Sequence, residues 1–338
     1  MKALFLDTPS FGKKDMISAF EQCGIEITLF YHDAIRDYPS QAFDAYFDSL
    51  AVGESYSFVY SFNYYPAVSN GCMRNGLKYL AFVYDNPLLS LYSYTMINPC
   101  NYVFLFDKTC YETFAREGIP TVYYLPLCAN TGRLSQMQLS DQQASILHSD
   151  VSFVGSLYNE DHNLLDRMTD LDDYTKGYLD AIMNAQQKVN GYFFVEEVLT
   201  PSIVDAMKRS LEYKPIPGGT ETPAYVYANF FLARKITALE RQRLLYAVSK
   251  AFQTKLYTHQ PTPSLPHIQN MGAVDYYEVM PHVFKQSKIN LNITLRSIQS
   301  GMPLRAWDIM GAGGFLLSNY QADFFDFFTP GEDFDYFD

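Results

Sequence analysis

The sequence predicts an α/β protein of two domains, each built around a parallel β-sheet. The chain has 338 residues, whereas a single core usually serves about 100–200 residues. Short apolar runs alternate with helical stretches in the first third of the chain, which is typical of parallel strands joined by helices. We therefore expect an N-terminal domain at residues 1–130, a crossover at residues 131–150 and a C-terminal domain at residues 151–338.

The N-terminal domain is predicted to begin with a strand, a helix and a second strand. Residues 3–7 form a short apolar run that ends at a turn. Residues 13–23 carry apolar side chains at helical spacing, and residues 25–30 return to an apolar strand. Further strands are expected where β-rich runs are bounded by Gly, Pro, Asn or Asp, at residues 57–61, 79–84, 102–106 and 121–124.

The C-terminal domain opens with a predicted strand at residues 150–156, which ends in a glycine turn. Strand signals are weak from residue 160 to residue 250, so a helical insertion is expected there, with a loop around residues 215–219. The remaining predicted elements are strands at residues 255–258 and 289–293, a helix that begins near Pro303, and a strand at residues 314–318.

Composition limits the classes of partner. The formal net charge of −12 argues against nucleic acid, because phosphate backbones are bound by clustered Lys and Arg. A phosphorylated small molecule remains compatible, since one helix N-terminus or one backbone nest can bind it. Aromatic residues make up 16% of the chain. They either fill cores and interfaces or line a carbohydrate or nucleobase site, and composition does not decide between these roles.

The sequence predicts a cytoplasmic protein without a transmembrane segment. The apolar run at the N-terminus is too short for a signal peptide, and no run approaches the ~20 residues that span a bilayer. The five cysteines are odd in number and lack CxxC spacing, so reduced thiols are expected. No metal site is predicted, because the histidines, including His259 and His267, lack ligand spacing.

The most informative segment runs from residue 289 to residue 318. It combines a strand, a polar loop with Gly301 and Pro303, a short helix and another strand. Such a helix N-terminus offers N–H groups and a positive dipole to an anion. Asp308 lies farther along the helix and can accept hydrogen bonds from a ribose diol, with Arg305 near it. The alternative is that Arg305 and Asp308 form only a surface ion pair.

From residue 289 onward, the pieces INLNIT, GMPLRAWDIMGAGGFLLS and DFFDFFTPGED resemble the C-terminal region of the CgeB-like spore-maturation glycosyltransferases, which belong to the GT-B group. Upstream, VFLFDKTCYETFAREGIPTVYYLPLCAN and DVSFVGSLYN resemble the domain that often precedes that region. Together these pieces cover most of the chain. The resemblance implies two facing Rossmann-like domains with an interdomain cleft, and a nucleotide-sugar donor site in the C-terminal half.

The resemblance also implies site residues. In many GT-B enzymes two acids separated by seven residues flank the donor-binding helix, and the matching positions here are Ser300 and Asp308. Asp308 keeps the ribose-binding role, whereas Ser300 departs from an acid, so neither a donor-sugar contact nor a stereochemical course follows from it. The expected donor-binding residues are Gly155, Ser156, Gly272, Ala273, Val274, Ser300, Gly301, Met302, Arg305 and Asp308.

Three groups within this set have separate roles. By the resemblance, Gly301 and Met302 supply N–H groups to the diphosphate. Residues 271–276 lie where GT-B proteins commonly hold the nucleobase through backbone groups, and the alternative is an ordinary turn before a helix. Gly155 and Ser156 end a strand, and ligands of open α/β sheets bind at the carboxyl ends of strands, so a phosphate contact is expected there.

Two residues of the N-terminal half are candidates on the acceptor side. Gly12 follows the first strand and suits a close backbone approach, although the loop lacks the GxGxxG pattern of nicotinamide-binding proteins. Asp85 ends a predicted strand and is the candidate general base for an acceptor hydroxyl. The alternative for Asp85 is an Asx-type turn before Pro87.

The function implied is a metal-independent glycosyltransferase that moves a sugar from a nucleoside diphosphate donor, UDP-sugar favoured, to an acceptor hydroxyl, with no tightly bound cofactor. One alternative is a nucleotide- or sugar-binding protein without turnover, which the non-acidic Ser300 supports. Another is a nucleotide-sugar epimerase, which needs no acceptor. GT-B chains usually continue into helices that return to the N-terminal domain, so a chain that ends at Asp338 is expected to be a shortened one.

Overall fold

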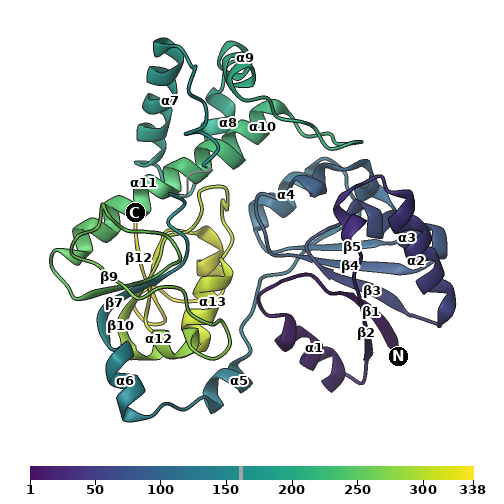
Figure 1. Ribbon diagram of the computed structural model, residues 1–338, viewed down its shortest axis with the longest axis horizontal. Coiled ribbons are helices and arrows are strands. Elements are labelled where there is room, and N and C mark those ends of the chain that lie inside the picture. Colours follow the sequence, from purple (N-terminus) through teal and green to yellow (C-terminus); the bar gives the residue numbers. More distant parts are fainter. Residues whose placement is uncertain (160–162) are drawn as a thin grey trace. The chain divides into compact units, whose positions relative to one another are not determined.

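The computed structural model describes residues 1–159 and 163–338, which form two compact units. The first unit comprises Met1–Pro126 and Lys214–Glu221, and the second comprises Leu127–Tyr213 and Thr222–Asp338. Each unit is built on one six-stranded sheet whose paired strands are all parallel, with helices around it (Figure 1). The predicted α/β class with parallel sheets is therefore confirmed.

The sheet of the first unit has the strand order β2-β1-β3-β4-β5-β6. Its strands are β1 (Lys2–Leu6), β2 (Glu26–Phe30), β3 (Phe58–Phe62), β4 (Lys78–Val83), β5 (Asn101–Leu105) and β6 (Val122–Tyr124). Its α-helices are α1 (Lys13–Gln22), α2 (Gln41–Gly53), α3 (Pro66–Asn75) and α4 (Lys108–Arg116), and 3-10 turns lie at Asp33–Arg36, Leu89–Tyr92 and Tyr94–Ile97. The change of direction in this order lies between β1 and β3.

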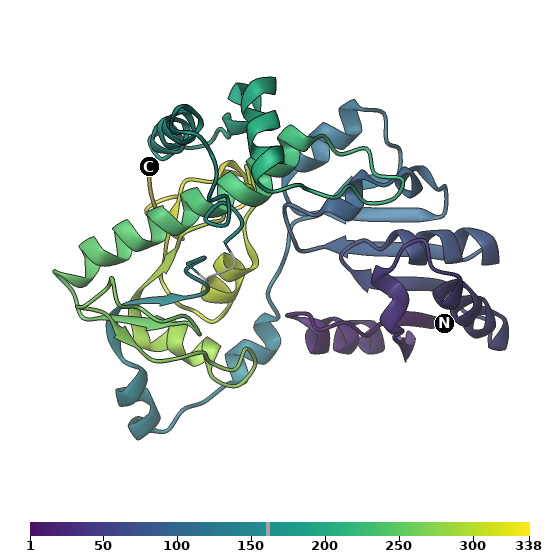
Figure 2. The same cartoon turned by 45° about the horizontal axis from the view of Figure 1, so that its top comes forward.

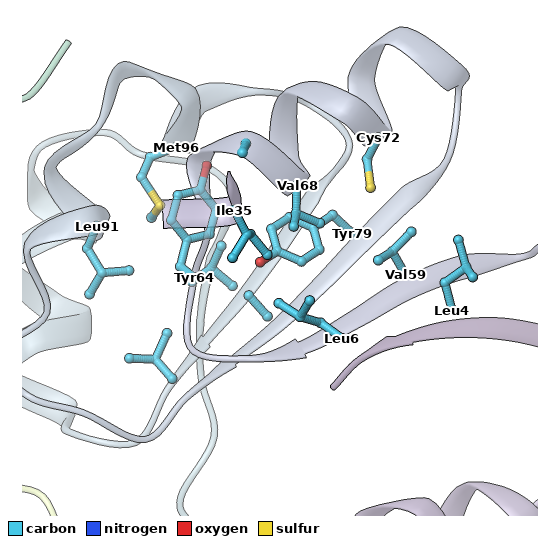
Figure 3. Packing of buried hydrophobic residues seen from close by; sticks show 14 of the residues in the cluster. Leu4, Leu6, Ile35, Val59, Tyr64, Val68, Cys72, Tyr79, Leu91 and Met96 are labelled. Carbon is cyan, nitrogen blue, oxygen red and sulfur yellow. The ribbon is translucent and has the colours of Figure 1, made fainter. Parts of the chain in front are cut away.

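Both faces of this first sheet are covered by apolar side chains. On one face, Val59 and Tyr79 of the strands pack with Val68 and Cys72 of α3 in a single buried cluster (Figure 3). The other face is aromatic, since Phe5, Tyr60 and Phe62 contact one another edge-on or tilted, and Phe20 of α1 covers them. Many of the aromatic residues counted in the sequence therefore serve packing.

The sheet of the second unit has the order β12-β11-β10-β7-β8-β9. Its strands are β7 (Ser149–Val154), β8 (Thr254–Tyr257), β9 (Gln269–Asn270), β10 (Ser287–Asn292), β11 (Leu316–Asn319) and β12 (Asp335–Phe337). The order reverses between β7 and β10, which therefore form the topological switch point of this sheet. Ligands of open α/β sheets bind at the carboxyl ends of the strands at such a point.

Helices occupy most of the remaining second unit. They are α5 (Thr131–Gln136), α6 (Asp141–Leu147), α7 (Asp173–Gln186), α8 (Val195–Val198), α9 (Pro201–Ser210), α10 (Pro223–Val226), α11 (Ala233–Ser249), α12 (Met280–Gln286) and α13 (Leu304–Gly311), with a 3-10 turn at Ala322–Asp326. A π-helical turn at Tyr227–Leu232 joins α10 to α11, and Figure 2 shows the three as one rod. Among the described residues, no helix combines the length and apolarity needed to cross a bilayer.

Ten strands predicted from the sequence are present within two residues of their expected bounds, and two short edge strands were not predicted. Residues 335–337, where the sequence predicts no strand, form β12 and pair in parallel with β11. The polar stretch 131–150 contains α5 and α6, because Asn130 and Ser140 cap these helices and Ser140 forms a capping box with Gln143. Helices α7 to α11 lie within residues 173–249, inside the stretch where the insertion was expected, and residues 160–162 of that stretch lie outside the described part of the chain.

The contact between α2 and α3 depends on Gly71. A Cβ atom at this position would lie 2.5 Å from the Phe47 ring, which is fully buried. We expect Gly71→Ala to destabilise the first unit by about 1–3 kcal/mol, as overpacking of a core does. Gly53→Ala is the matched control, since a Cβ there meets no described atom within 4 Å. Urea unfolding of both variants measures the difference, and equal midpoints would contradict the packing argument.

Candidate functional site

The carboxyl ends of β7 and β10 are tied together by one buried side chain, Arg241 of α11. Its Nη1 donates to the Ser156 carbonyl at 2.5 Å, and its Nη2 donates to the Ile293 carbonyl at 2.5 Å. Arg241 is 8% exposed, and burial lowers the pKa of its guanidinium, with the charge of Arg305 acting in the same direction. Tyr158 and the carboxylate of Glu240 act in the opposite direction and raise this pKa.

Tyr158 extends this cationic cluster. The guanidinium carbons of Arg234 and Arg241 each lie 4.5 Å from the centre of the Tyr158 ring. The two arginines are seven residues apart on the α10–α11 rod, so they share one side of the helix. Tyr158 has a positive φ of 54°, which is unfavourable for an aromatic residue and marks a tightly constrained turn after β7.

Sequence analysis did not identify Arg234, Arg241 or Tyr158 as site residues. The only signal was the seven-residue spacing of the two arginines, which equally suits a solvated helix face. These residues contact one another only in the folded unit, where α11 packs beside the end of β7.

Gly155 and Ser156, the predicted phosphate contacts, lie within the same turn. The N–H of Gly155 donates to the Tyr257 carbonyl at 3.1 Å, which keeps the turn against the end of β8. The Ser156 hydroxyl accepts from Tyr158 N at 2.9 Å and from Gln260 Nε2 at 3.0 Å. The turn is thus held by its own backbone, by Gln260 and by Arg241.

The loop after β10 leads into α13, where the predicted diphosphate contacts lie. Ser300, Gly301 and Met302 are buried, and Pro303 is the N-cap of the helix. The first N–H groups of an α-helix have no partner within the helix and carry its positive dipole end. The start of α13 is therefore suited to an anion.

Asp308 lies in α13 and is largely buried. Its Oδ1 accepts a hydrogen bond from the Tyr276 hydroxyl at 2.9 Å, and its Oδ2 lies 3.4 Å from Arg305 Nη1. The side chains of Arg305 and Asp308 are 23% and 10% exposed, so the simple surface ion pair considered as an alternative does not describe them. Arg305 also contacts Met280 and lies over the Phe284 ring, 5.7 Å from its centre.

The Tyr276–Asp308 hydrogen bond brings the predicted nucleobase segment to α13. In this segment, Gly272 has a φ of 77° and its N–H donates to Asn270 Oδ1 at 3.0 Å. Val274 packs against the buried cluster that contains Met302 and Ala306. Ala273 lies between them in the chain and is exposed, and α12 follows at Met280. The segment is thus a turn before a helix and also a neighbour of Asp308.

The predicted residues of the first unit lie at the carboxyl ends of β1, β3 and β4. Asp85 is exposed, and its Oδ2 accepts from Asn63 Nδ2 at 2.7 Å. Asn63 Oδ1 in turn accepts from the N–H groups of Tyr84 and Asp85. Asn63 has a φ of 61°, an αL conformation that asparagine tolerates. Gly12 has a φ of 74°, and a Cβ there would meet the Tyr84 ring at 3.8–3.9 Å.

No group of three or more His, Cys, Asp or Glu side chains within residues 1–159 and 163–338 is arranged to hold a metal ion. All five cysteines are free thiols.

Comparisons with known proteins bear on the family and the fold. Residues 234–338 match a family described as glycosyl transferase-like, and this segment contains Arg241, residues 271–276 and α13. No curated protein sequence matches the chain. The structure is similar to that of Anabaena HepE solved in complex with UDP-glucose, with a TM-score of 0.50 and 10% identity over 100% of this chain and 85% of that one.

A second similar structure is a glycosyltransferase from Rickettsia africae, with a TM-score of 0.46 and 9% identity over 99% of this chain and 83% of that one. At these identities the structures show the fold and not the substrates. The chain accordingly has the α/β architecture of GT-B glycosyltransferases, and its residues 234–338 match the glycosyl transferase-like family.

Proposed function

We propose that the protein is a glycosyltransferase of the CgeB-like type that binds a nucleoside diphosphate sugar, UDP-sugar favoured, in its second unit. The observation that carries this proposal is the hydrogen bond between Tyr276 and Asp308. It brings a buried carboxylate, the loop that contains Gly272 and the start of α13 together within the segment that matches the glycosyl transferase-like family. HepE of Anabaena, which shares the fold, was solved with UDP-glucose.

Each part of the donor then has a partner. Asp308 accepts hydrogen bonds from the ribose hydroxyls, and the backbone of residues 272–274 holds the base. The diphosphate lies at the start of α13, where Gly301 and Met302 offer N–H groups. Arg305 and Arg241 supply positive charge, and Gly155 and Ser156 border the phosphates. These groups stabilise the diphosphate as it leaves, so no metal ion is required in this proposal.

The acceptor hydroxyl loses its proton to Asp85 in this proposal. Its oxygen forms a bond to the anomeric carbon while the bond from that carbon to the diphosphate oxygen breaks. The hydrogen bond from Asn63 holds the Asp85 carboxylate at the end of β4. Asp85 is exposed enough to meet a substrate, as a general base must be.

A second candidate is a nucleotide-binding protein without turnover. The observation that favours it is Ser300, which is buried and carries a hydroxyl where many GT-B enzymes have an acid. Tight nucleotide binding without transfer or hydrolysis of any sugar would support this candidate.

The donor site predicts that Asp308→Asn weakens nucleotide binding. Losing a buried charged hydrogen bond should cost about 1–3 kcal/mol, or roughly 5- to 150-fold in Kd. Calorimetric titration of UDP, GDP, dTDP and ADP into the wild-type protein and the variant measures this, with UDP expected to bind most tightly. Tyr276→Phe, which removes one hydrogen bond from the same carboxylate, should give a smaller loss.

Asp335→Asn is the control for this experiment, because Asp335 is an exposed acid on the edge strand β12. Its Kd should equal that of the wild type. If Asp308→Asn lowers the thermal midpoint but leaves the nucleotide Kd unchanged, Asp308 is only a structural partner of Arg305 and Tyr276.

The acceptor side makes a separate prediction. Asp85→Asn should lower kcat for release of the nucleoside diphosphate by about 10²–10⁴-fold, as expected for loss of a general base. Its Kd for UDP should stay within about twofold of the wild type, since all the groups proposed to bind the donor lie in the second unit. A coupled assay of UDP release measures kcat. An unchanged kcat would mean that Asp85 is not a general base and only forms an Asx-type turn before Pro87.

A further inference from the structure

The carboxyl edge of the first sheet presents polar and aromatic side chains around Asp85. The loops that follow neighbouring strands meet there. A Cβ at Gly12 would lie 3.8 Å from the Tyr84 hydroxyl, and Asn63 N donates to the Phe82 carbonyl at 2.8 Å. Asp85 is the proposed general base for the acceptor, so the groups beside it indicate which acceptor this surface can recognise.

Asn63 and Asp85 form a fixed pair of one donor and one acceptor. Asn63 Oδ1 accepts from the N–H groups of Tyr84 and Asp85, which orients the amide so that its Nδ2 lies 2.7 Å from Asp85 Oδ2. Within the described part of the chain, neither the second N–H of this Nδ2 nor Asp85 Oδ1 has a hydrogen-bond partner. An incoming molecule therefore meets a donor and an acceptor side by side.

Such a pair matches two neighbouring hydroxyl groups better than one. A hydroxyl both donates and accepts hydrogen bonds, so one hydroxyl can donate to Asp85 Oδ1 while its neighbour accepts from Asn63 Nδ2. Vicinal hydroxyls of this kind are the pattern of a sugar ring. A serine or threonine side chain has a single hydroxyl and would leave one of the two protein groups unused.

Two large aromatic rings are exposed at the same edge of the sheet. Phe11, after β1, is 58% exposed, and Tyr31, after β2, is 48% exposed. The two loops start side by side, because β1 and β2 pair in parallel and Asp7 N donates to the Phe30 carbonyl at 2.8 Å. A pyranose ring carries C–H groups on one face, and this apolar face packs against an aromatic ring while the hydroxyls stay free for hydrogen bonds.

The charges at this edge do not suit an anionic acceptor. Lys13, at the start of α1, forms an ion pair with Asp7 at 2.5 Å, and the two side chains are 30% and 38% exposed. Each charge of this pair is matched by the other. The Asp85 carboxylate repels a phosphate or a second carboxylate that approaches it. An uncharged acceptor is therefore favoured.

We infer that the acceptor is an uncharged saccharide, that a vicinal diol of its ring binds Asp85 Oδ1 and Asn63 Nδ2, and that one face of the ring packs on Phe11. This inference rests on the proposed function, because it takes Asp85 as the general base. The hydroxyl bound to Asp85 loses its proton to that carboxylate as its oxygen bonds to the anomeric carbon and the diphosphate leaves. Its neighbour only orients the ring, so Asn63 and Phe11 are specificity-determining residues.

The test is saturation-transfer NMR on the full chain with excess UDP, which occupies the proposed donor site. Methyl β-D-glucopyranoside and methyl β-D-galactopyranoside are the neutral saccharide probes. Glucose 6-phosphate tests an anionic acceptor, N-acetylserine amide tests a protein-like hydroxyl, and 2-(hydroxymethyl)tetrahydropyran keeps the ring without a diol. We expect saturation of at least one methyl glycoside, and at least about fivefold weaker binding of the other three probes, each of which loses one hydrogen bond or meets repulsion.

Phe11→Ala should weaken binding of that glycoside about fivefold, the usual effect of losing one aromatic contact. Phe11→Trp should bind as well as the wild type, because it keeps an aromatic face. Phe252→Ala is the matched control, since Phe252 is 55% exposed and lies in the second unit. Its Kd for the glycoside, measured by titration in the same NMR experiment, should equal that of the wild type.

The failure of this inference is distinguishable from failure of the proposed function, because calorimetry measures UDP binding separately. If UDP binds but no methyl glycoside receives saturation, the acceptor class is wrong and the donor site is retained. Equal binding of the ring without a diol, tighter binding of N-acetylserine amide, or an unchanged Kd in Phe11→Ala would also overturn the inference. If UDP does not bind, the proposed function is wrong, and the acceptor assignment with it.

Discussion

The buried guanidinium of Arg241 is the interaction on which the second unit's site depends. It holds the carbonyls of Ser156 and Ile293, and through them the loops that leave β7 and β10 at the switch point of the sheet. A planar guanidinium can donate to two carbonyls at once, which the single ammonium of a lysine does less well. The shape of the site is therefore set by a helix packed on the sheet and not by the loops alone.

The two largely buried arginines Arg241 and Arg296 have different hydrogen-bond partners. Burial of an unpaired cation is costly, and carbonyl dipoles recover only part of that cost. Arg296, the other largely buried arginine in this region, is instead paired with Glu240. Arg296 is thus held by a carboxylate, whereas the hydrogen bonds that the described residues give Arg241 run to the carbonyls of Ser156 and Ile293 beside the turn at Gly155.

Much of the fold followed from local patterns in the sequence. Strands such as β1 and β10 are short apolar runs bounded by turns. Gly301 and Pro303 predicted the start of α13, because both residues lie within a few positions of the first helical residue. The edge strands β9 and β12 were missed because they are short and polar, and only pairing with a neighbour makes them strands. The resemblance directed attention to Asp308, and the structure adds Tyr276 as its partner.

The parts of the site that could not be predicted are contacts between distant residues. Arg241 meets carbonyls 85 and 52 residues away in the chain, and no local periodicity encodes such a contact. The same holds for Asn63, which meets Asp85 across two neighbouring strands.

The segment Lys214–Glu221 has a consequence for the order in which the protein can fold during synthesis. It belongs to the first unit, where Tyr94 N donates to the Gly218 carbonyl at 3.1 Å and Thr220 N donates to the Tyr92 carbonyl at 2.7 Å. These bonds cannot form until the ribosome has added about ninety residues beyond Pro126 and released them from its tunnel. The first unit therefore emerges first but is completed late. In a nascent chain or a fragment that stops at Pro126, the Tyr94 N–H and the Tyr92 carbonyl form hydrogen bonds with water instead.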